Sequence, residues 1–365
     1  MSDEGSGPAP HGTAGAGVTA MTGRERMVAA LRRQPVDRTP VWFMRQAGRS
    51  LAAYRELRER YDILTITRTP ELCARVTLMP VDQLGVDAAV LYADIMLPLV
   101  GMGVPFSIDP GLGPIIHEPL RSAADIARLM VVESAEEATP DLFAAIRSIR
   151  DELGERAAVI GFAGAPFTVA SYLIEGHPSR DYARSKALMH GEPELWDRLM
   201  EKLTEVTVRY LRAQVAAGVD ILQLFDSWIG ALSRRDYEAR VLPHVQRIFA
   251  GLAGTGVPLI YFGTGCSHLL EIMATAGSDA VSVDWRLPLD EAWKRIGPGL
   301  GIQGNLDPTV ALASWPVVER ETRRVLAEAG GRDGHVFNLG HGVLPDTDAA
   351  TLERVVELVH RETAR

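Results

Sequence analysis

The chain has 365 residues, of which 47% are hydrophobic and 23% charged, and its formal net charge at pH 7 is −9. This composition is typical of a folded, enzyme-sized protein and excludes a disordered chain. The acidic balance argues against nucleic-acid or anionic-membrane binding, and the two cysteines, Cys73 and Cys266, are too few and too far apart for a disulfide framework.

The N-terminal stretch has the composition of a disordered extension. Residues 1–21 contain no Lys or Arg and are rich in Gly, Ala, Ser and Pro, so they resemble neither a signal peptide nor a transit peptide. Thr22-Gly23-Arg24-Glu25 then forms a capping box that predicts the first helix. We therefore expect one ordered domain over residues 22–365. The most apolar stretch, residues 95–106, is short and broken by proline and glycine, so it cannot span a bilayer.

Beyond this point, short apolar runs alternate with amphipathic helical segments. Eight runs are found in chain order, at residues 40–44, 88–92, 157–162, 219–225, 258–262, 280–283, 300–303 and 336–339. Continuous apolar runs are typical of parallel strands buried on both faces, and their alternation with helices indicates βαβ units. Eight such units predict an α/β fold of the (β/α)8, or TIM-barrel, type.

Two features refine this expectation. A doubly wound sheet that binds a dinucleotide would carry a glycine-rich turn, but the nearest match, Gly263-Thr264-Gly265, has His268 where the third glycine should be. The segment between the second and third runs is long and punctuated by proline and glycine, so residues 101–150 are predicted to be an insertion with its own helices.

In a TIM barrel the chemistry lies on the loops that follow the strands. Arg45 and Arg49 follow the first run and are four residues apart, so both can point the same way and bind carboxylates of an anionic ligand. The alternative is that one of them pairs with a structural acid such as Asp284 while the other is solvated.

Polar residues on other loops each allow a functional and a structural interpretation. Asp94, after the second run, could accept N–H hydrogen bonds or act as a general base, or it could simply cap a helix. Tyr172 could donate to a developing charge or merely pack. His341, between two glycines, could meet an anion or be a buried structural histidine. Ser227 lacks the GxSxG context of a nucleophile, and no metal-binding motif is present, so no metal is expected.

Several long segments resemble the signature sequences of the uroporphyrinogen decarboxylase family. The two most specific are residues 40–49, PVWFMRQAGR, and residues 161–176, which contain GFAGAPFT and YLIEG. Further matching segments are Asp94-Ile95, LQLFDSW at 222–228, VDWR at 283–286, QGNLDP at 303–308 and NLGHG at 338–342. Together they cover essentially all of residues 22–360.

The resemblance implies a cytoplasmic, homodimeric barrel enzyme of porphyrin and haem biosynthesis. It would convert the four acetate side chains of uroporphyrinogen to methyl groups, giving coproporphyrinogen without a cofactor. By position, Arg45, Arg49 and His341 match residues that contact substrate carboxylates, and Arg45 is also implied in catalysis. Asp94 matches the catalytic aspartate that faces the pyrrole N–H groups. The remaining matches are Tyr172 and Ser227, as polar site residues, and Phe162 and Phe225, as apolar walls.

The sequence departs from the family pattern at a few positions. Ser50, Ala52 and Ala53 stand where tyrosine, proline and glutamate are common, and Ala93 stands where a serine often precedes the aspartate. These changes affect loop packing rather than the implied chemistry. Two rival interpretations are a catalytically silent tetrapyrrole-binding protein and a zinc-dependent methyltransferase of the same superfamily. The implied site residues argue against the first, and Thr264, in place of a zinc-binding histidine, argues against the second.

Overall fold

The computed structural model describes residues 19–109 and 111–365. Within these residues the central feature is a curled, all-parallel sheet of seven strands in the order β1-β4-β5-β6-β7-β8-β9. The strands are β1 (Ala88–Val90), β4 (Ala158–Gly164), β5 (Ile221–Asp226), β6 (Leu259–Gly263), β7 (Ala280–Ser282), β8 (Gly301–Gln303) and β9 (His335–Val336). The prediction of an α/β fold with a parallel sheet is confirmed.

The first of the eight predicted strands differs from the rest. Residues 40–44 form no regular strand and contain a single isolated parallel bridge, between Val41 and Phe337. The backbone of this segment is nevertheless bonded on both sides. Trp42 N–H donates to the Phe337 carbonyl (3.3 Å), and the Val41 carbonyl accepts from Asp87 N–H (2.8 Å), just before β1. The segment therefore bridges the two edge strands of the sheet, β9 and β1.

A buried layer of polar side chains crosses the interior enclosed by the sheet. Trp42 Nε1–H donates to Gln303 Oε1 (2.8 Å), and Gln303 Nε2 donates to Gln223 Oε1 (3.0 Å) and Ser282 Oγ (2.9 Å). These residues come from the bridging segment and from β8, β5 and β7. This network therefore ties the bridging segment to three strands of the sheet.

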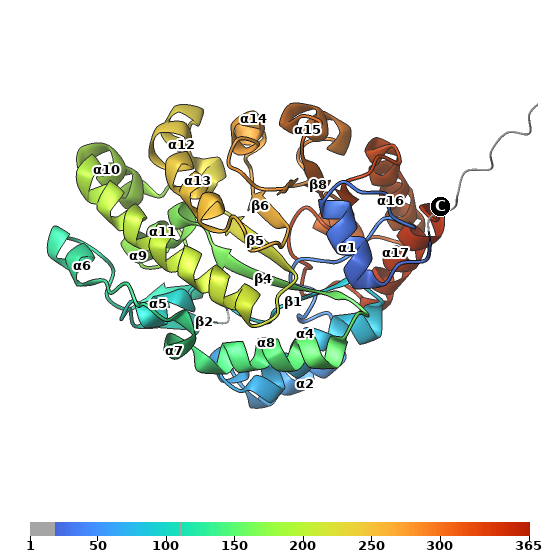
Figure 1. The fold of residues 1–365 in the computed structure, drawn as a ribbon, viewed down its shortest axis with the longest axis horizontal. Helices are drawn as coiled ribbons and strands as arrows, with labels where there is room; N and C mark the ends of the chain where they lie inside the picture. The colour runs from blue at the N-terminus through green and yellow to red at the C-terminus, as the bar shows by residue number, and fades with distance from the viewer. Residues whose placement is uncertain (1–18, 110) are drawn as a thin grey trace, which may run out of the picture.

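Helices surround the outer face of the sheet (Figure 1). They include α4 (Pro70–Leu84), α8 (Pro140–Leu153), α11 (Pro193–Ala216), α13 (Leu242–Gly251), α15 (Leu289–Ile296), α16 (Trp315–Ala329) and α17 (Ala349–Glu362). Helix α11 buries one face, which includes Leu195, Leu199, Leu203, Val206 and Tyr210. The last helix, α17, packs against both α16 and α4, so the outer helices meet around the sheet.

Further helices complete the connections. They are α1 (Gly23–Leu31), α2 (Ala52–Arg60), α3 (Ile63–Thr67), α5 (Pro98–Gly101), α6 (Ala123–Arg128), α7 (Ala135–Ala138), α9 (Pro166–Glu175), α10 (Ala183–Gly191), α12 (Arg234–Arg240) and α14 (Leu270–Met273), with 3-10 turns η1 (Ile229–Ala231), η2 (Ser267–Leu269) and η3 (Pro308–Leu312). No helix in the described part of the chain is both long and apolar enough to cross a membrane.

The long connection between β1 and β4 holds extra structure. An antiparallel pair, β2 (Phe106–Asp109) and β3 (Gly113–Ile116), lies between α5 and α6. Backbone bonds tie this region to α9, since Ile116 N–H donates to the Gly176 carbonyl (2.8 Å) and Leu120 N–H to the Leu173 carbonyl (2.8 Å). The connection ends in α8, which packs against α4 in the outer layer.

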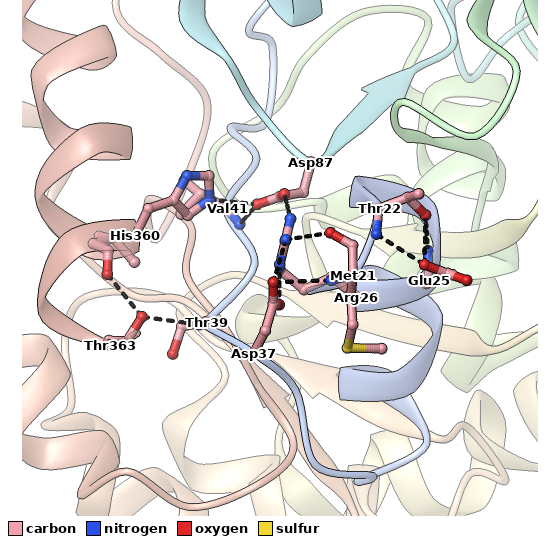
Figure 2. A network of polar contacts seen from close by, with 11 residues as sticks. Met21, Thr22, Glu25, Arg26, Asp37, Thr39, Val41, Asp87, His360 and Thr363 are labelled. Atoms are coloured by element: carbon pink, nitrogen blue, oxygen red, sulfur yellow. Dashed lines mark hydrogen bonds and ion pairs between the residues drawn. The ribbon is translucent and has the colours of Figure 1, made fainter. Parts of the chain in front are cut away.

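The chain's first and last helices are joined by a buried ionic network that we call the clasp (Figure 2). Arg26 of α1, only 1% exposed, donates to Asp37 (2.6 and 2.8 Å) and Asp87 (2.5 Å). Asp87 also accepts from Val41 N–H (2.7 Å) and pairs with His360 of α17 (2.7 Å). Helix α1 begins with the predicted Thr22–Glu25 capping box, and residues 1–18 of the predicted extension lie outside the described residues.

Candidate active site

The loop after residues 40–44 is held from both sides. Gln46 accepts from Phe43 N–H (2.9 Å) and donates its side-chain amide to the Ala88 carbonyl of β1 (2.8 Å). Met44 N–H donates to Asn338 Oδ1 (3.1 Å), and the Met44 carbonyl accepts from Val343 N–H (2.8 Å). The loop is therefore bonded to the segments on either side of it, after β9 and in β1.

Arg45 stands at the centre of the candidate site. Its backbone is left-handed (φ +60°), which is uncommon for a residue with a Cβ, and its side chain is exposed. Burial raises the pKa values of Asp94 and Tyr172 and lowers that of His341, and the positive charge of Arg45 opposes the first two shifts and adds to the third. Three predicted residues from separate parts of the chain therefore lie within electrostatic reach of the Arg45 guanidinium.

Asp94 follows β1 and lies half-buried. Burial raises the pKa of its carboxyl group, while a hydrogen bond from Met96 N–H (2.8 Å to Oδ1) and the charge of Arg45 oppose that rise. One carboxylate oxygen of Asp94 therefore caps the turn that leads into α5, as the capping interpretation predicted. That bond uses one oxygen, so capping and a role in the site are compatible.

Tyr172 projects from α9 and is 8% exposed. Burial and the negative charge of Asp94 raise the pKa of its phenol, so it is a neutral hydrogen-bond donor near pH 7. Its ring packs on Trp228, with 4.1 Å between centroids. Tyr172 therefore packs, as one interpretation predicted, and it also lies within electrostatic reach of Asp94 and Arg45. Donation to a developing charge stays a prediction.

His341 lies half-buried in the loop after β9, between Gly340 and Gly342. Burial and the positive charge of Arg45 lower its pKa to about 4, so the imidazole is neutral near pH 7. A neutral ring can donate one hydrogen bond to an anion without adding charge. Its ring lies 6.1 Å, centroid to centroid, from Phe262.

An aromatic row leads across neighbouring strands toward His341. Phe162 of β4 contacts Phe225 of β5 edge to face (5.3 Å between centroids), and Phe225 contacts Phe262 of β6 (5.6 Å). Phe162 and Phe225 are 8% and 9% exposed, so each keeps a small accessible edge. The two predicted wall residues are therefore in contact with one another.

The remaining predicted residues share the loops but are less tightly defined. Arg49 is exposed, and its carbonyl accepts from Arg55 (2.7 Å). Ser227 is half-buried directly after β5. Asp284, the acid suggested as a structural partner for Arg45 or Arg49, is bonded by Arg286 (2.5 Å) and by Gly265 N–H (2.5 Å). The substrate contacts of these and of all the other predicted site residues stay predictions.

The sequence did not reveal the residues that hold the site in place. Gln46 and Asn338 lie inside the motif segments, but the segments alone do not show what their side chains bond. Gln46 donates to the Ala88 carbonyl and Asn338 accepts from Met44 N–H, and local spacing does not reveal partners so distant in sequence. Over the stretches 19–109 and 111–365, no group of three or more His, Cys, Asp or Glu side chains is placed to hold a metal ion.

Comparison with known proteins gives a consistent result. The family model described as uroporphyrinogen decarboxylase (URO-D) matches residues 22–362. A protein named uroporphyrinogen decarboxylase from Sorangium cellulosum is 55% identical to the chain, and the match covers 92% of the chain and 96% of that relative. A protein of the same name from Thermus thermophilus is 52% identical, over 93% of the chain and 98% of that relative. A solved methyltransferase structure from Methanosarcina mazei aligns with a TM-score of 0.80 at 21% identity, over 94% of this chain and 99% of that one. The latter likeness concerns the fold.

Proposed function

The chain belongs to the uroporphyrinogen decarboxylase family, and from this premise we propose that the loops around Arg45 are its active site. The protein decarboxylates uroporphyrinogen in porphyrin and haem biosynthesis. The observation that supports this location is that Asp94, Tyr172 and His341, from separate parts of the chain, all have pKa values on which the charge of Arg45 acts. Perturbed titratable groups that converge in this way are typical of active sites.

Loss of carbon dioxide from an acetate leaves an electron pair that needs an acceptor. The substrate can supply one, because protonating the pyrrole carbon next to the acetate creates an iminium-like cation. The electrons of the breaking C–C bond then flow into that cation, which leaves an exocyclic methylene group on a neutral ring. A proton added at the methylene carbon gives the methyl group, and loss of the proton first added to the ring carbon restores the pyrrole. The reaction therefore needs a stabilised cation and held carboxylates, and we assign no cofactor to it.

In this mechanism Asp94 is the main catalytic residue. As an ionised carboxylate it accepts hydrogen bonds from the pyrrole N–H groups and stabilises the ring cation. Burial raises the pKa of Asp94 in the free protein, and the charge of Arg45 and the substrate N–H donors oppose that rise. Catalysis of this kind uses a charge that is already in place before the reaction begins.

The other side chains bind and position the substrate. Arg45, Arg49 and His341 hold acetate and propionate carboxylates, and Arg45 contributes its positive charge at the reacting acetate. We assign Arg45 an electrostatic role, because a guanidinium is a positive charge that carries five N–H donors. Tyr172 and Ser227 donate hydrogen bonds, and the macrocycle lies against Phe162 and Phe225.

We propose three further properties on the same basis. The bridging segment 40–44 acts as the remaining strand of a closed (β/α)8 barrel over residues 22–365, because its backbone bonds to both sheet edges. The extra helices and hairpin between β1 and β4 form an insertion in residues 101–150. The enzyme works in the cytoplasm as a homodimer. Sedimentation equilibrium of the purified chain tests the dimer directly.

Anaerobic incubation with uroporphyrinogen, followed by counting the carboxyl groups of the product, tests the proposed site. The wild-type protein should remove all four acetate carboxyls. Asp94→Asn keeps the shape and should lower turnover by about 10²–10³-fold, as loss of a transition-state partner typically does. A matched control is Asp348→Asn, because Asp348 also caps a backbone N–H two residues on, in an exposed position. Equal rates for Asp94→Asn and wild type would remove Asp94 from the mechanism.

A further inference from the structure

A second aspartate lies beneath the loops, at the end of β5. Asp226 is fully buried, and its carboxylate accepts hydrogen bonds from Thr168 Oγ1 (2.7 Å) and Tyr261 OH (3.0 Å). Tyr237 OH donates in turn to the Tyr261 hydroxyl (3.1 Å). Burial of a polar carboxyl group among uncharged partners is costly unless its hydrogen bonds are made, so the contacts of Asp226 are specific ones.

The Thr168 hydroxyl uses both of its hydrogen-bonding capacities. It donates to Asp226 and accepts from the N–H of Trp228 (3.4 Å), which lies two residues after Asp226. Helix α9 has no side-chain cap at its start, where Ala165 N–H donates to the Phe225 carbonyl (2.7 Å). The Thr168 hydroxyl is therefore the side-chain link between the first turns of α9 and the end of β5.

This link lies one helical turn from the site. Thr168 and Tyr172 are four residues apart on α9, so they share a face of the helix. The Tyr172 ring packs on Trp228 at 4.1 Å with 35° between the ring planes, and the Trp228 backbone is bonded to Thr168. The same hydroxyl thus fixes both the helix that carries Tyr172 and the residue against which Tyr172 packs.

We propose that Asp226 and Thr168 are positioning residues that set the place of the Tyr172 hydroxyl relative to Asp94 and Arg45. The inference rests on the proposed role of Tyr172 in the site. Neither positioning residue touches the substrate; both act through α9 and Trp228. Misplacement of a site group by about 1 Å can lower a rate by about 10²-fold, so a single hydroxyl in this position is sufficient to matter.

Thr168→Val tests the proposal, because valine has nearly the same shape and lacks the hydroxyl. We expect kcat/KM for uroporphyrinogen to fall by roughly 10- to 100-fold, and Thr168→Ser to restore most of it. Thr204→Val is the matched control: Thr204 is also buried, and its hydroxyl donates only within α11, to the Met200 carbonyl (2.7 Å). That variant should keep wild-type kcat/KM with a comparable change in Tm.

A double-mutant cycle with Tyr172→Phe separates positioning from general stability. If Thr168 acts through the Tyr172 hydroxyl, Thr168→Val should cost little more activity once that hydroxyl is gone. Multiplicative losses would overturn the proposal, as would wild-type activity in Thr168→Val beside a clear loss in Tyr172→Phe. Failure of the proposed function would be seen elsewhere, as wild-type turnover in Asp94→Asn.

Discussion

The aliphatic part of the Arg45 side chain lies directly over the α-carbon of Gly342. A Cβ atom at position 342 would come within 2.5 Å of Arg45 Cδ and 2.9 Å of Cγ. Such distances are far inside van der Waals contact. The glycine that follows His341 therefore provides the space in which Arg45 lies, and the loops after residues 40–44 and β9 are fitted to each other.

From this contact we predict that Gly342→Ala displaces Arg45. The methyl group meets the stem of the side chain rather than its tip, so the guanidinium must move. We expect kcat/KM for uroporphyrinogen to fall by roughly 10- to 100-fold, since a displaced charge no longer faces Asp94 and the acetate. Steady-state kinetics measure the loss, and Tm should change little because Arg45 is exposed.

The control for this prediction is Gly299→Ala. Gly299 is exposed and has open space around it, so an added methyl group meets nothing within 4 Å. It should leave activity unchanged. Should Gly342→Ala behave like Gly299→Ala, the role given to this contact would be wrong.

A second prediction concerns His341 and acid stability. The pKa of His341 is lowered to about 4 by burial and by the charge of Arg45, below the unfolded value of about 6.5. The folded state thus favours the neutral ring. The resulting stability is fully present above about pH 6.5 and is lost as pH falls toward 4, by an amount on the order of 1–3 kcal/mol.

Urea unfolding of wild type and His341→Gln at several pH values checks this. Other groups titrate in the same window, so the informative quantity is the difference between the two proteins. We expect the wild type to lose stability relative to the variant between pH 6.5 and 4. A difference that stays constant across this window would contradict the lowered pKa.

The third prediction concerns the clasp of Figure 2. Arg26→Met leaves Asp37 and Asp87 without their buried cation, and removing one member of such a pair costs about 3–5 kcal/mol. Arg147→Met is the control, because Arg147 and its partner Glu136 are 50% and 48% exposed and should contribute at most about 1 kcal/mol. Similar urea midpoints for the two variants would show that the clasp is not a major source of stability.

Local patterns predicted the elements better than the contacts between them. The capping box at Thr22 and the buried face of α11 were visible because each depends on residues within a few positions. Residues 40–44 read as a strand because they are apolar, yet they form a single bridge. Strand assignment depends on pairing with Phe337, almost 300 residues away, which local sequence does not encode.

The same reasoning applies to the site. Motif resemblance identified Arg45, Asp94, Tyr172 and His341, because those residues stand in specific segments. The groups that hold them were missed, because Asn338 reaches Met44 only through the fold. Buried amides, hydroxyls and carboxyls leave no periodic signal, and they become visible only when partners distant in the chain are brought together.

The last prediction uses Asp226, whose pH effect has the opposite sign to that of His341. Burial raises its pKa to about 7, against 3.8 for an unperturbed aspartate, although the bonds from Thr168 and Tyr261 oppose the rise. The folded state therefore favours the neutral acid. Its contribution to stability is fully present below about pH 4 and is lost as pH rises through 7, by about 4 kcal/mol at most.

Asp226→Asn removes this titration while keeping a side chain of the same shape. Asparagine can donate to Tyr261, whose hydroxyl can then donate to Tyr237, so the chain of hydroxyls stays satisfied by reversing direction. We expect the variant to gain stability relative to wild type between pH 5 and pH 8 in urea unfolding. A pH-independent difference would mean that Asp226 has the same pKa folded and unfolded, because only a group whose pKa changes on folding makes stability depend on pH.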